Sequence, residues 1–328
     1  MARLSPGSRS SRCVDSSVGC SWRAGGVDSA RPLFPLSGGG AVLMQSRSQQ
    51  TIRRAVAVEG VGYWSGVPCR VEFLPAAAGS GVTFLRCVDG ATVRIPVSVE
   101  NRIEASARTN LAVAGAVVQM VEHAVSAVVG LGIDCCQIRV SAEELPGLDG
   151  SSLPFVAALD EAGIERLGPP VAPLVVTEPC RVSDGEAWIE ALPSEQPGLS
   201  VEYELDYGPG PIGLQRLALR VTPESYRSEL AAARTFIMQS EAERLRAAGL
   251  ACGVTTSELI VFGQDGPIDN PLRWPDECVR HKVLDLVGDL ALVGRPLQSR
   301  VRACRSGHRL NAALAAELRD LPRRRAIA

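Results

Sequence analysis

The feature that most constrains the fold is a long apolar segment, from Leu111 to Ile133, with ionisable residues near its middle. Its length suits a membrane span, but Glu122 and His123 interrupt it, and such side chains are costly in lipid. We therefore expect a buried helix from about Val117 to Val129 that ends at Gly130-Leu131-Gly132. Two ionisable groups in so apolar a helix need polar partners, which predicts a polar site inside the protein.

The composition is that of a globular protein of about two domains. The chain has 328 residues, of which 46% are apolar and 21% are charged. These values exclude a disordered or collagen-like chain. The formal net charge of -2 excludes a strongly basic nucleic-acid-binding protein. The Pro- and Gly-rich stretch Leu167–Pro173 is the best linker, and it predicts an N-terminal α/β domain over 44–170 and a C-terminal α/β domain over 171–328.

Alternating and helical apolar patterns give a coarse list of elements after the first 43 residues. Strands are expected at about 51–59, 71–74, 137–140, 174–182, 186–192, 199–206, 258–262 and 297–304. Helices are expected, besides the one described above, at about 152–162, 223–233, 239–248, 276–293 and 310–319.

Residues 1–43 do not have the pattern of a folded segment. They contain nine serines and five arginines, and no apolar stretch long enough for a signal peptide. We expect a disordered tail or a non-native start, and a transit peptide is the alternative. The ten cysteines include no C-x-x-C pair, which favours small buried side chains in a reducing compartment over a metal or redox site.

Lysine and histidine are scarce, and two of these rare residues, His281 and Lys282, lie in the expected helix at 276–293. Lys282 is the only lysine among 34 basic residues, and His123, His281 and His308 are the only histidines. Lysine is a compact point charge that arginine does not replace at a tight site, so its retention suggests a chemical role. His308 lies in a small-residue turn before the last expected helix, where a surface loop residue is the plainest interpretation.

His281 and Asp285 are spaced for metal binding. They lie at i and i+4 on one helix, and Asp289 follows at i+8, so all three share a face. The first two can chelate one ion, whereas Asp289 is about 12 Å from His281 along the axis and is placed to orient another ionisable group. A solvent-facing helix explains such a spacing in most proteins. The apolar residues between them predict that the opposite face is core.

A weak internal repeat brings His123 into the same argument. His123 begins the run His-Ala-Val-Ser-Ala-Val-Val-Gly, and His281 begins His-Lys-Val-Leu-Asp-Leu-Val-Gly. Duplicated α/β domains that face each other would place both histidines in one cleft, although chance can also give this match. A catalytic zinc takes three protein ligands, and His123, His281 and Asp285 meet that count, with Glu122 beside them as a general base. The alternative is that all three histidines bind the metal ion and that Asp285 contacts a ligand instead of the ion.

Nine short motifs together point to one family. In chain order they are Gln50-Thr51-Ile52, Gly60-Val61-Gly62, Val121-Glu122-His123, Gly130-Leu131-Gly132-Ile133-Asp134, Leu148-Asp149-Gly150-Ser151, Ala233-Arg234-Thr235-Phe236, Val279-Arg280-His281-Lys282-Val283-Leu284-Asp285, Gly288-Asp289 and Ser306-Gly307-His308. No motif is specific alone, but their order and spacing are. The chain resembles the zinc-dependent UDP-3-O-acyl-N-acetylglucosamine deacetylases of lipid A biosynthesis from about Gln49 to Leu321.

The resemblance implies an α+β fold of two similar α/β sandwich domains, with helices packed between two sheets and the active site at the domain junction. It implies Zn²⁺ as cofactor, with Fe²⁺ able to use the same ligands. The substrate would be UDP-3-O-acyl-N-acetylglucosamine. A cytoplasmic monomer with no transmembrane segment and no nucleic-acid partner is expected.

The resemblance also assigns roles to individual residues. The metal ligands would be His123, His281 and Asp285. The catalytic residues would be Glu122 as base, His308 as general acid or electrostatic stabiliser, Asp289 to orient it, Thr235 to bind the oxyanion and Lys282 as a cationic contact. The substrate contacts would be Arg305 on the diphosphate, Tyr207 near the uracil, and Phe236, Ile237 and Met238, with Leu250–Val254, along an apolar groove for the acyl chain.

The chain departs from the family pattern at three places. Tyr63-Trp64 stand where Leu-His is frequent, Ile237-Met238 stand where Gly-Phe is frequent, and Cys252-Gly253-Val254 replace an expected glycine pair. These positions flank the acyl groove, so they leave the acyl preference open. Two other hypotheses are a zinc amidase for another N-acylated sugar nucleotide and a non-catalytic zinc- or nucleotide-binding paralogue. An intact Glu122 argues against the latter.

Overall fold

The computed structural model describes residues 47–251 and 254–325, and these residues belong to one compact unit. The expectations for residues 1–43 and for Cys252-Gly253 lie outside the described residues. The domain boundary near residue 171 stays a prediction.

The first half of the described chain builds a five-stranded sheet in the order β2-β3-β9-β4-β5. Its strands are β2 (Val56–Val61), β3 (Pro68–Pro75), β4 (Val82–Val88), β5 (Ala91–Pro96) and β9 (Cys136–Val140). Alternate residues of β3, namely Cys69, Val71 and Phe73, are buried, as expected for a sheet with one covered face. Helices α1 (Glu122–Gly130) and α2 (Leu153–Ala162) belong to this half, and Phe155 of α2 packs edge-on against Phe73.

The second half builds another sheet, in the order β12-β13-β18-β14-β15. Its strands are β12 (Cys180–Asp184), β13 (Ala187–Leu192), β14 (Leu199–Asp206), β15 (Leu214–Val221) and β18 (Leu297–Cys304), and β11 (Leu174–Val175) also pairs with β18. Helices α5 (Glu277–Leu290) and α6 (His308–Arg325) pack against this sheet.

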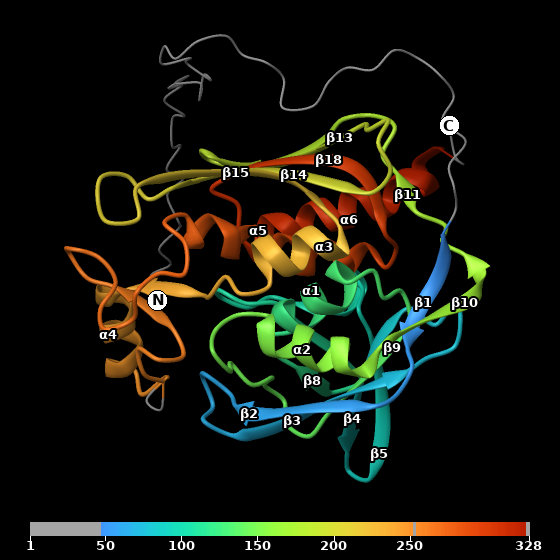
Figure 1. Cartoon of the computed structure of the whole chain (residues 1–328), viewed down its shortest axis with the longest axis horizontal. Coiled ribbons are helices and arrows are strands. Elements are labelled where there is room, and N and C mark those ends of the chain that lie inside the picture. Colours follow the sequence, from blue (N-terminus) through green and yellow to red (C-terminus); the bar gives the residue numbers. More distant parts are fainter. Residues whose placement is uncertain (1–46, 252–253, 326–328) are drawn as a thin grey trace, which may run out of the picture. The chain divides into compact units, whose positions relative to one another are not determined.

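The two halves share one topology. In each sheet the central strand, β9 or β18, pairs antiparallel on one side and parallel on the other, and a hairpin lies at each edge. In each half, two hairpins come first in the chain, and a helix, the central strand and a second helix follow. The helices lie between the two sheets, with α1 against α5 (Figure 1). This arrangement confirms the predicted α+β fold of two similar sandwiches.

Each half carries its own insertion and short elements. The first has β6 (Arg102–Ile103), β7 (Asn110–Val113) and β8 (Ala116–Val118), which form a small sheet before α1. The second has α3 (Pro223–Ser225), a π-helical turn (Tyr226–Leu230), β16 (Phe236–Met238), α4 (Gln239–Ala247) and β17 (Ile260–Phe262), with β16 and β17 parallel. Two 3₁₀ turns, Val99–Asn101 and Ala291–Val293, and the pair β1 (Ser48–Ile52) and β10 (Ile164–Pro170) complete the fold.

Several sequence predictions need correction. The apolar segment before Glu122 is not helical, because β8 occupies its start and α1 begins only at Glu122. Most of the predicted linker is strand β10, which is held by pairing with β1. His308 is the first residue of α6 rather than part of a preceding turn. The strands β4, β5, β6, β7, β8, β15 and β16 were not predicted. Among the described residues, no helix has the length and apolarity needed to cross a membrane.

The contact between α1 and α5 depends on a glycine. A Cβ atom on Gly288 would lie 2.3 Å from the carbonyl oxygen of Glu122, so only glycine allows α5 to approach α1 this closely. The Ser126 hydroxyl of α1 donates a hydrogen bond to the Leu284 carbonyl of α5 at 2.8 Å across the same interface. The helices that carry His123 and His281 are therefore fixed relative to each other.

We predict that Gly288→Ala destabilises the protein and weakens metal binding. Alanine favours a helix interior over glycine by about 1 kcal/mol, but relief of the clash with α1 should cost more, for a net loss of roughly 1–3 kcal/mol. Thermal unfolding and metal titration measure both effects. Gly168→Ala is the control, because no atom lies near the added methyl group in β10. Equal melting temperatures for the two variants would contradict the prediction.

Candidate metal centre and active site

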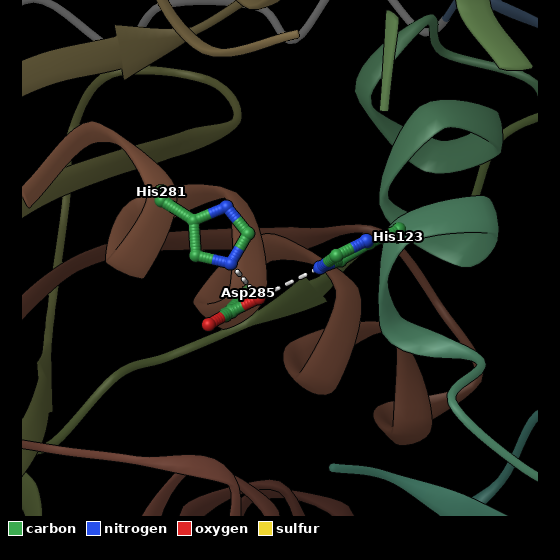
Figure 2. A group of neighbouring side chains, drawn as sticks. All are labelled: His123, His281 and Asp285. Atoms are coloured by element: carbon green, nitrogen blue, oxygen red, sulfur yellow. Dashed lines mark ion pairs between the residues drawn. The ribbon is translucent and has the colours of Figure 1, made fainter. Parts of the chain in front are cut away.

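Two helices bring the three predicted metal ligands together. His123 lies in the first turn of α1, and His281 and Asp285 lie one turn apart on α5. The Nε2 atoms of His123 and His281 are 3.5 and 3.3 Å from Oδ1 of Asp285 (Figure 2). One donor atom from each residue lies within 4.8 Å of the others, and all three side chains are buried. Among the described residues, this is the only such group of three.

The hydrogen bonding of His281 leaves its second nitrogen free to bind a cation. Its Nδ1 lies 3.0 Å from the Ala233 carbonyl oxygen, which can only accept, so Nδ1 carries the proton. Burial lowers the pKa of His281 to about 3, although Asp285 opposes this shift, so the ring is neutral. The lone pair on Nε2 therefore faces the Asp285 carboxylate.

Asp285 presents one free oxygen to this group. Its Oδ2 accepts a hydrogen bond from Nζ of Lys282 at 2.6 Å, whereas its buried Oδ1 has no hydrogen-bond partner. Burial opposes ionisation, but the neighbouring His281 and Lys282 outweigh it and hold the pKa of Asp285 well below its usual range. A buried charged oxygen that faces a lone pair requires a cation. The residues therefore fit a divalent metal ion, and two imidazoles with a carboxylate suit zinc.

The only lysine of the chain contacts this group. Burial disfavours the charged form of Lys282, but Asp285 outweighs it, and the pKa of Lys282 is raised. The side chain stays positive at the edge of the metal site, as its retention in a lysine-poor sequence suggested.

Glu122 is held beside the ligands in a form suited to accept a proton. Its Oε2 accepts a hydrogen bond from the backbone N–H of Thr109 at 2.9 Å. Burial raises the pKa of Glu122, and the attraction of His308 and His123 offsets part of that shift. A buried carboxylate with a raised pKa is a better general base than an exposed one.

His308 and Asp289 form a second buried pair beside the ligands. Nδ1 of His308 lies 2.9 Å from Oδ2 of Asp289, and Nε2 lies 3.9 Å from Oδ2 of Asp285. Burial disfavours the imidazolium, but Asp289, then Asp285 and Glu122, outweigh it and raise the pKa of His308 to about 9. At neutral pH His308 is therefore protonated and can act as an acid. The group of mutually close donor atoms contains Asp285 and not His308, and a protonated imidazole has no lone pair for a metal ion, so this geometry favours Asp285 as the third ligand.

Sequence reasoning missed the residues that hold Asp289 and Glu122. The hydroxyl of Thr109 donates to Oδ1 of Asp289 at 2.6 Å, and Nδ2 of Asn311 donates to Oδ2 at 2.9 Å. Thr109 thus binds both carboxylates, one through its backbone and one through its side chain. A backbone donor leaves no mark in a sequence, and Thr109 lies between two motifs, so no pattern pointed to it.

The strand β16 brings the predicted acyl-groove residues next to the metal site. The Thr235 N–H donates to the Gly150 carbonyl at 2.8 Å just before β16 begins. The ring of Phe236 lies edge-on to His281, with centroids 6.4 Å apart, and to Tyr207, at 5.7 Å. Phe236, Ile237 and Met238 are all partly exposed. Aromatic and apolar side chains therefore extend from the ligands towards solvent.

The remaining predicted substrate contacts lie at the surface. Tyr207 is 46% exposed, and its ring lies edge-on to that of Phe236. Arg305 lies after β18 in a left-handed conformation, with φ of 52°, and its Nη1 pairs with Glu186 at 2.6 Å. A contact between Arg305 and a diphosphate would have to compete with Glu186.

Comparison with known proteins agrees with this geometry. Residues 49–320 match the model of the LpxC family, described as UDP-3-O-acyl N-acetylglycosamine deacetylase. The chain belongs to this family. It is 41% identical over 279 residues to the UDP-3-O-acyl-N-acetylglucosamine deacetylase of Solibacter usitatus, covering 84% of this chain and 92% of that protein. The proteins of the same name from Anaeromyxobacter dehalogenans and Leptospira biflexa are 39% and 35% identical, covering 83% and 81% of this chain and 87% and 88% of theirs.

We predict that the protein purifies with about one tightly bound divalent ion per chain. His281→Ala and Asp285→Ala should lose it, because each removes one of three donors. His308→Ala should keep it, because His308 is not among the three residues whose donor atoms lie close together. Atomic emission on the purified variants measures the metal content. Loss of metal in His308→Ala with retention in Asp285→Ala would instead favour the set of three histidines.

Proposed function

We propose that this protein hydrolyses the N-acetyl group of UDP-3-O-acyl-N-acetylglucosamine and releases acetate, as the family name and the names of its relatives indicate. The observation that carries the proposal is the buried set of His123, His281 and Asp285, with the Glu122 carboxylate and the protonated His308 imidazole both nearby. Amide hydrolysis needs a base for water and an acid for the leaving amine, and this site has both.

The proposed cofactor is one Zn²⁺ held by His123, His281 and Asp285, and Fe²⁺ can use the same ligands. When bound, zinc lowers the pKa of water and polarises the carbonyl group. Glu122, oriented by the Thr109 N–H, takes the proton from the attacking water. The oxygen adds to the acetyl carbon, and the C–N bond then breaks.

His308 and its neighbours complete the reaction. The imidazolium, fixed by Asp289, lies on the side of the ligands where it can donate its Nε2 proton to the leaving amine. Lys282 adds a positive charge near the developing oxyanion, and we assign a further hydrogen bond to the Thr235 hydroxyl. Water and the amide are consumed, and acetate and the free amine are produced.

We place this reaction in lipid A biosynthesis, the pathway implied by the family. Tyr207 and Arg305 are proposed to contact the uracil and the diphosphate. The residues Phe236, Ile237 and Met238 are proposed to line the acyl groove. A cytoplasmic location and a monomeric state stay predictions from the sequence.

We predict that Glu122→Gln keeps the metal but loses turnover by about 10²–10⁴-fold, because the amide can accept the Thr109 hydrogen bond but not a proton. Acetate release from UDP-3-O-acyl-N-acetylglucosamine, with metal content on the same sample, measures this. A variant with the parent's kcat would show that Glu122 is only structural. A parent protein that holds zinc but releases no acetate would contradict the proposed function itself.

We further predict that kcat/KM depends steeply on acyl length. Each buried methylene contributes about 0.8 kcal/mol, so a long chain in the groove adds several kcal/mol of binding. Ile237→Gly should widen the groove and shift the preferred length. The measurement is kcat/KM for substrates of graded acyl length and for one without the chain. Equal kcat/KM values across this series would contradict the acyl groove and favour an amidase for another N-acylated sugar nucleotide.

A further inference from the structure

Tyr63 links the first half of the protein to the segment before β17. It lies in the loop after β2, and its hydroxyl donates a hydrogen bond to the backbone carbonyl of Glu258, 195 residues away. Burial, with Asp149 and Glu258 nearby, raises the pKa of Tyr63. The hydroxyl is therefore protonated at neutral pH and can donate this hydrogen bond. None of the roles assigned above uses this residue.

The loop that carries Tyr63 is itself firmly held. The carboxylate of Glu144 accepts the backbone N–H groups of Trp64 and Ser65 at 2.8 and 2.7 Å. The ring of Tyr63 lies over Gly147, where a Cβ atom would come within 1.8 Å of it. This packing requires glycine at position 147 and restricts the position of the Tyr63 ring. The Tyr63 hydroxyl is consequently held in place to bond the Glu258 carbonyl.

The Glu258 carbonyl lies next to the backbone that holds Thr235. A Cβ atom on Gly150, which has a φ of 85°, would lie 2.5 Å from the Glu258 oxygen and 3.2 Å from the Tyr63 hydroxyl. The Gly150 carbonyl accepts the Thr235 N–H at 2.8 Å, and the Thr235 carbonyl accepts the Ile260 N–H at 3.0 Å. These bonds connect Tyr63, the segment before β17, Thr235 and Gly150 in one continuous series.

We propose that Tyr63 is a positioning residue that fixes β17, and through it β16, against the first half and so sets the width of the acyl groove. Three observations support this. Tyr63 bonds the chain two residues before β17, its hydroxyl donates to a backbone carbonyl, and β16 with Phe236 is parallel to β17 over Ile260–Phe262. The statement about the acyl groove rests on the proposed function, whereas the statement about β17 does not.

The test compares Tyr63→Phe with Tyr226→Phe. Each removes one tyrosine hydroxyl and keeps the ring, but the Tyr226 hydroxyl donates to Ser126 on α1, in the core and away from β16. Both should lose a similar amount of stability, because each loses one hydrogen bond of a buried hydroxyl. The Tyr226 variant therefore controls for general destabilisation.

The first measurement is hydrogen exchange and needs no activity. In Tyr63→Phe the amides of Thr235 and Ile260 should exchange roughly fivefold faster than in the parent, and in Tyr226→Phe they should not. Unchanged exchange in Tyr63→Phe, or an equal increase in both variants, would overturn the positioning role.

The second measurement is the acyl-length profile of acetate release. In Tyr63→Phe the KM for long-chain substrates should rise several-fold and the length preference should flatten, while kcat for the substrate without an acyl chain stays within about twofold of the parent. A profile identical to the parent's would refute the effect on the groove. If the parent releases no acetate from any substrate, the proposed function fails, and the exchange experiment still decides the role of Tyr63.

Discussion

The close approach of α1 and α5 is the constraint on which the rest of the site depends. Because Gly288 has no side chain, the backbone of Glu122 can lie directly against α5. His123 then faces Asp285, which is on the turn of α5 before Gly288. A wider spacing of the helices would separate His123 from the two donors on α5 and leave an uncompensated buried carboxylate, which is the costliest arrangement available to these residues.

A second set of contacts divides the site into a proton acceptor and a proton donor. Thr109 contacts both Glu122 and Asp289, which fixes the two carboxylates relative to each other. Glu122 has no cation bonded directly to it, so burial keeps its proton affinity high. Asp289 is paired with His308, so its negative charge stabilises the imidazolium instead. Two acidic residues of similar intrinsic strength thus take opposite roles because their neighbours differ.

The sequence predicted the residues of the candidate site better than it predicted the helices and strands that hold them. The spacing of His281, Asp285 and Asp289 on one helix and the repeat of the His-to-Gly run were visible, since both depend on local periodicity. The start of α1 was wrong by five residues because β8 is as apolar as the helix that follows it. Strand β10 was read as a linker because its Pro and Gly content hides its pairing with β1, whose last residue, Ile52, pairs with Ile164, 112 residues later. Long-range backbone contacts of this kind, like the Thr109 N–H, have no local signature.

The duplication explains how such a site arises from two copies of one plan. Aligned on their histidines, α1 and α5 both place a glycine seven residues later, and both glycines are packed too tightly for a side chain, Gly130 against the Tyr226 ring and Gly288 against α1. The copies differ where charge is concerned, since Ala124 and Ala127 of α1 correspond to Lys282 and Asp285 of α5.

This difference in charge has a direct chemical consequence. The apolar residues of α1 cannot solvate a charge, and burial raises the pKa of the Glu122 carboxyl group. The charged α5 supplies the anionic ligand and the cation that balances it. In the proposed mechanism, one helix therefore carries the base and the other carries the charged ligand. Neither half contains all three residues of the candidate metal site, which lies where α1 and α5 meet.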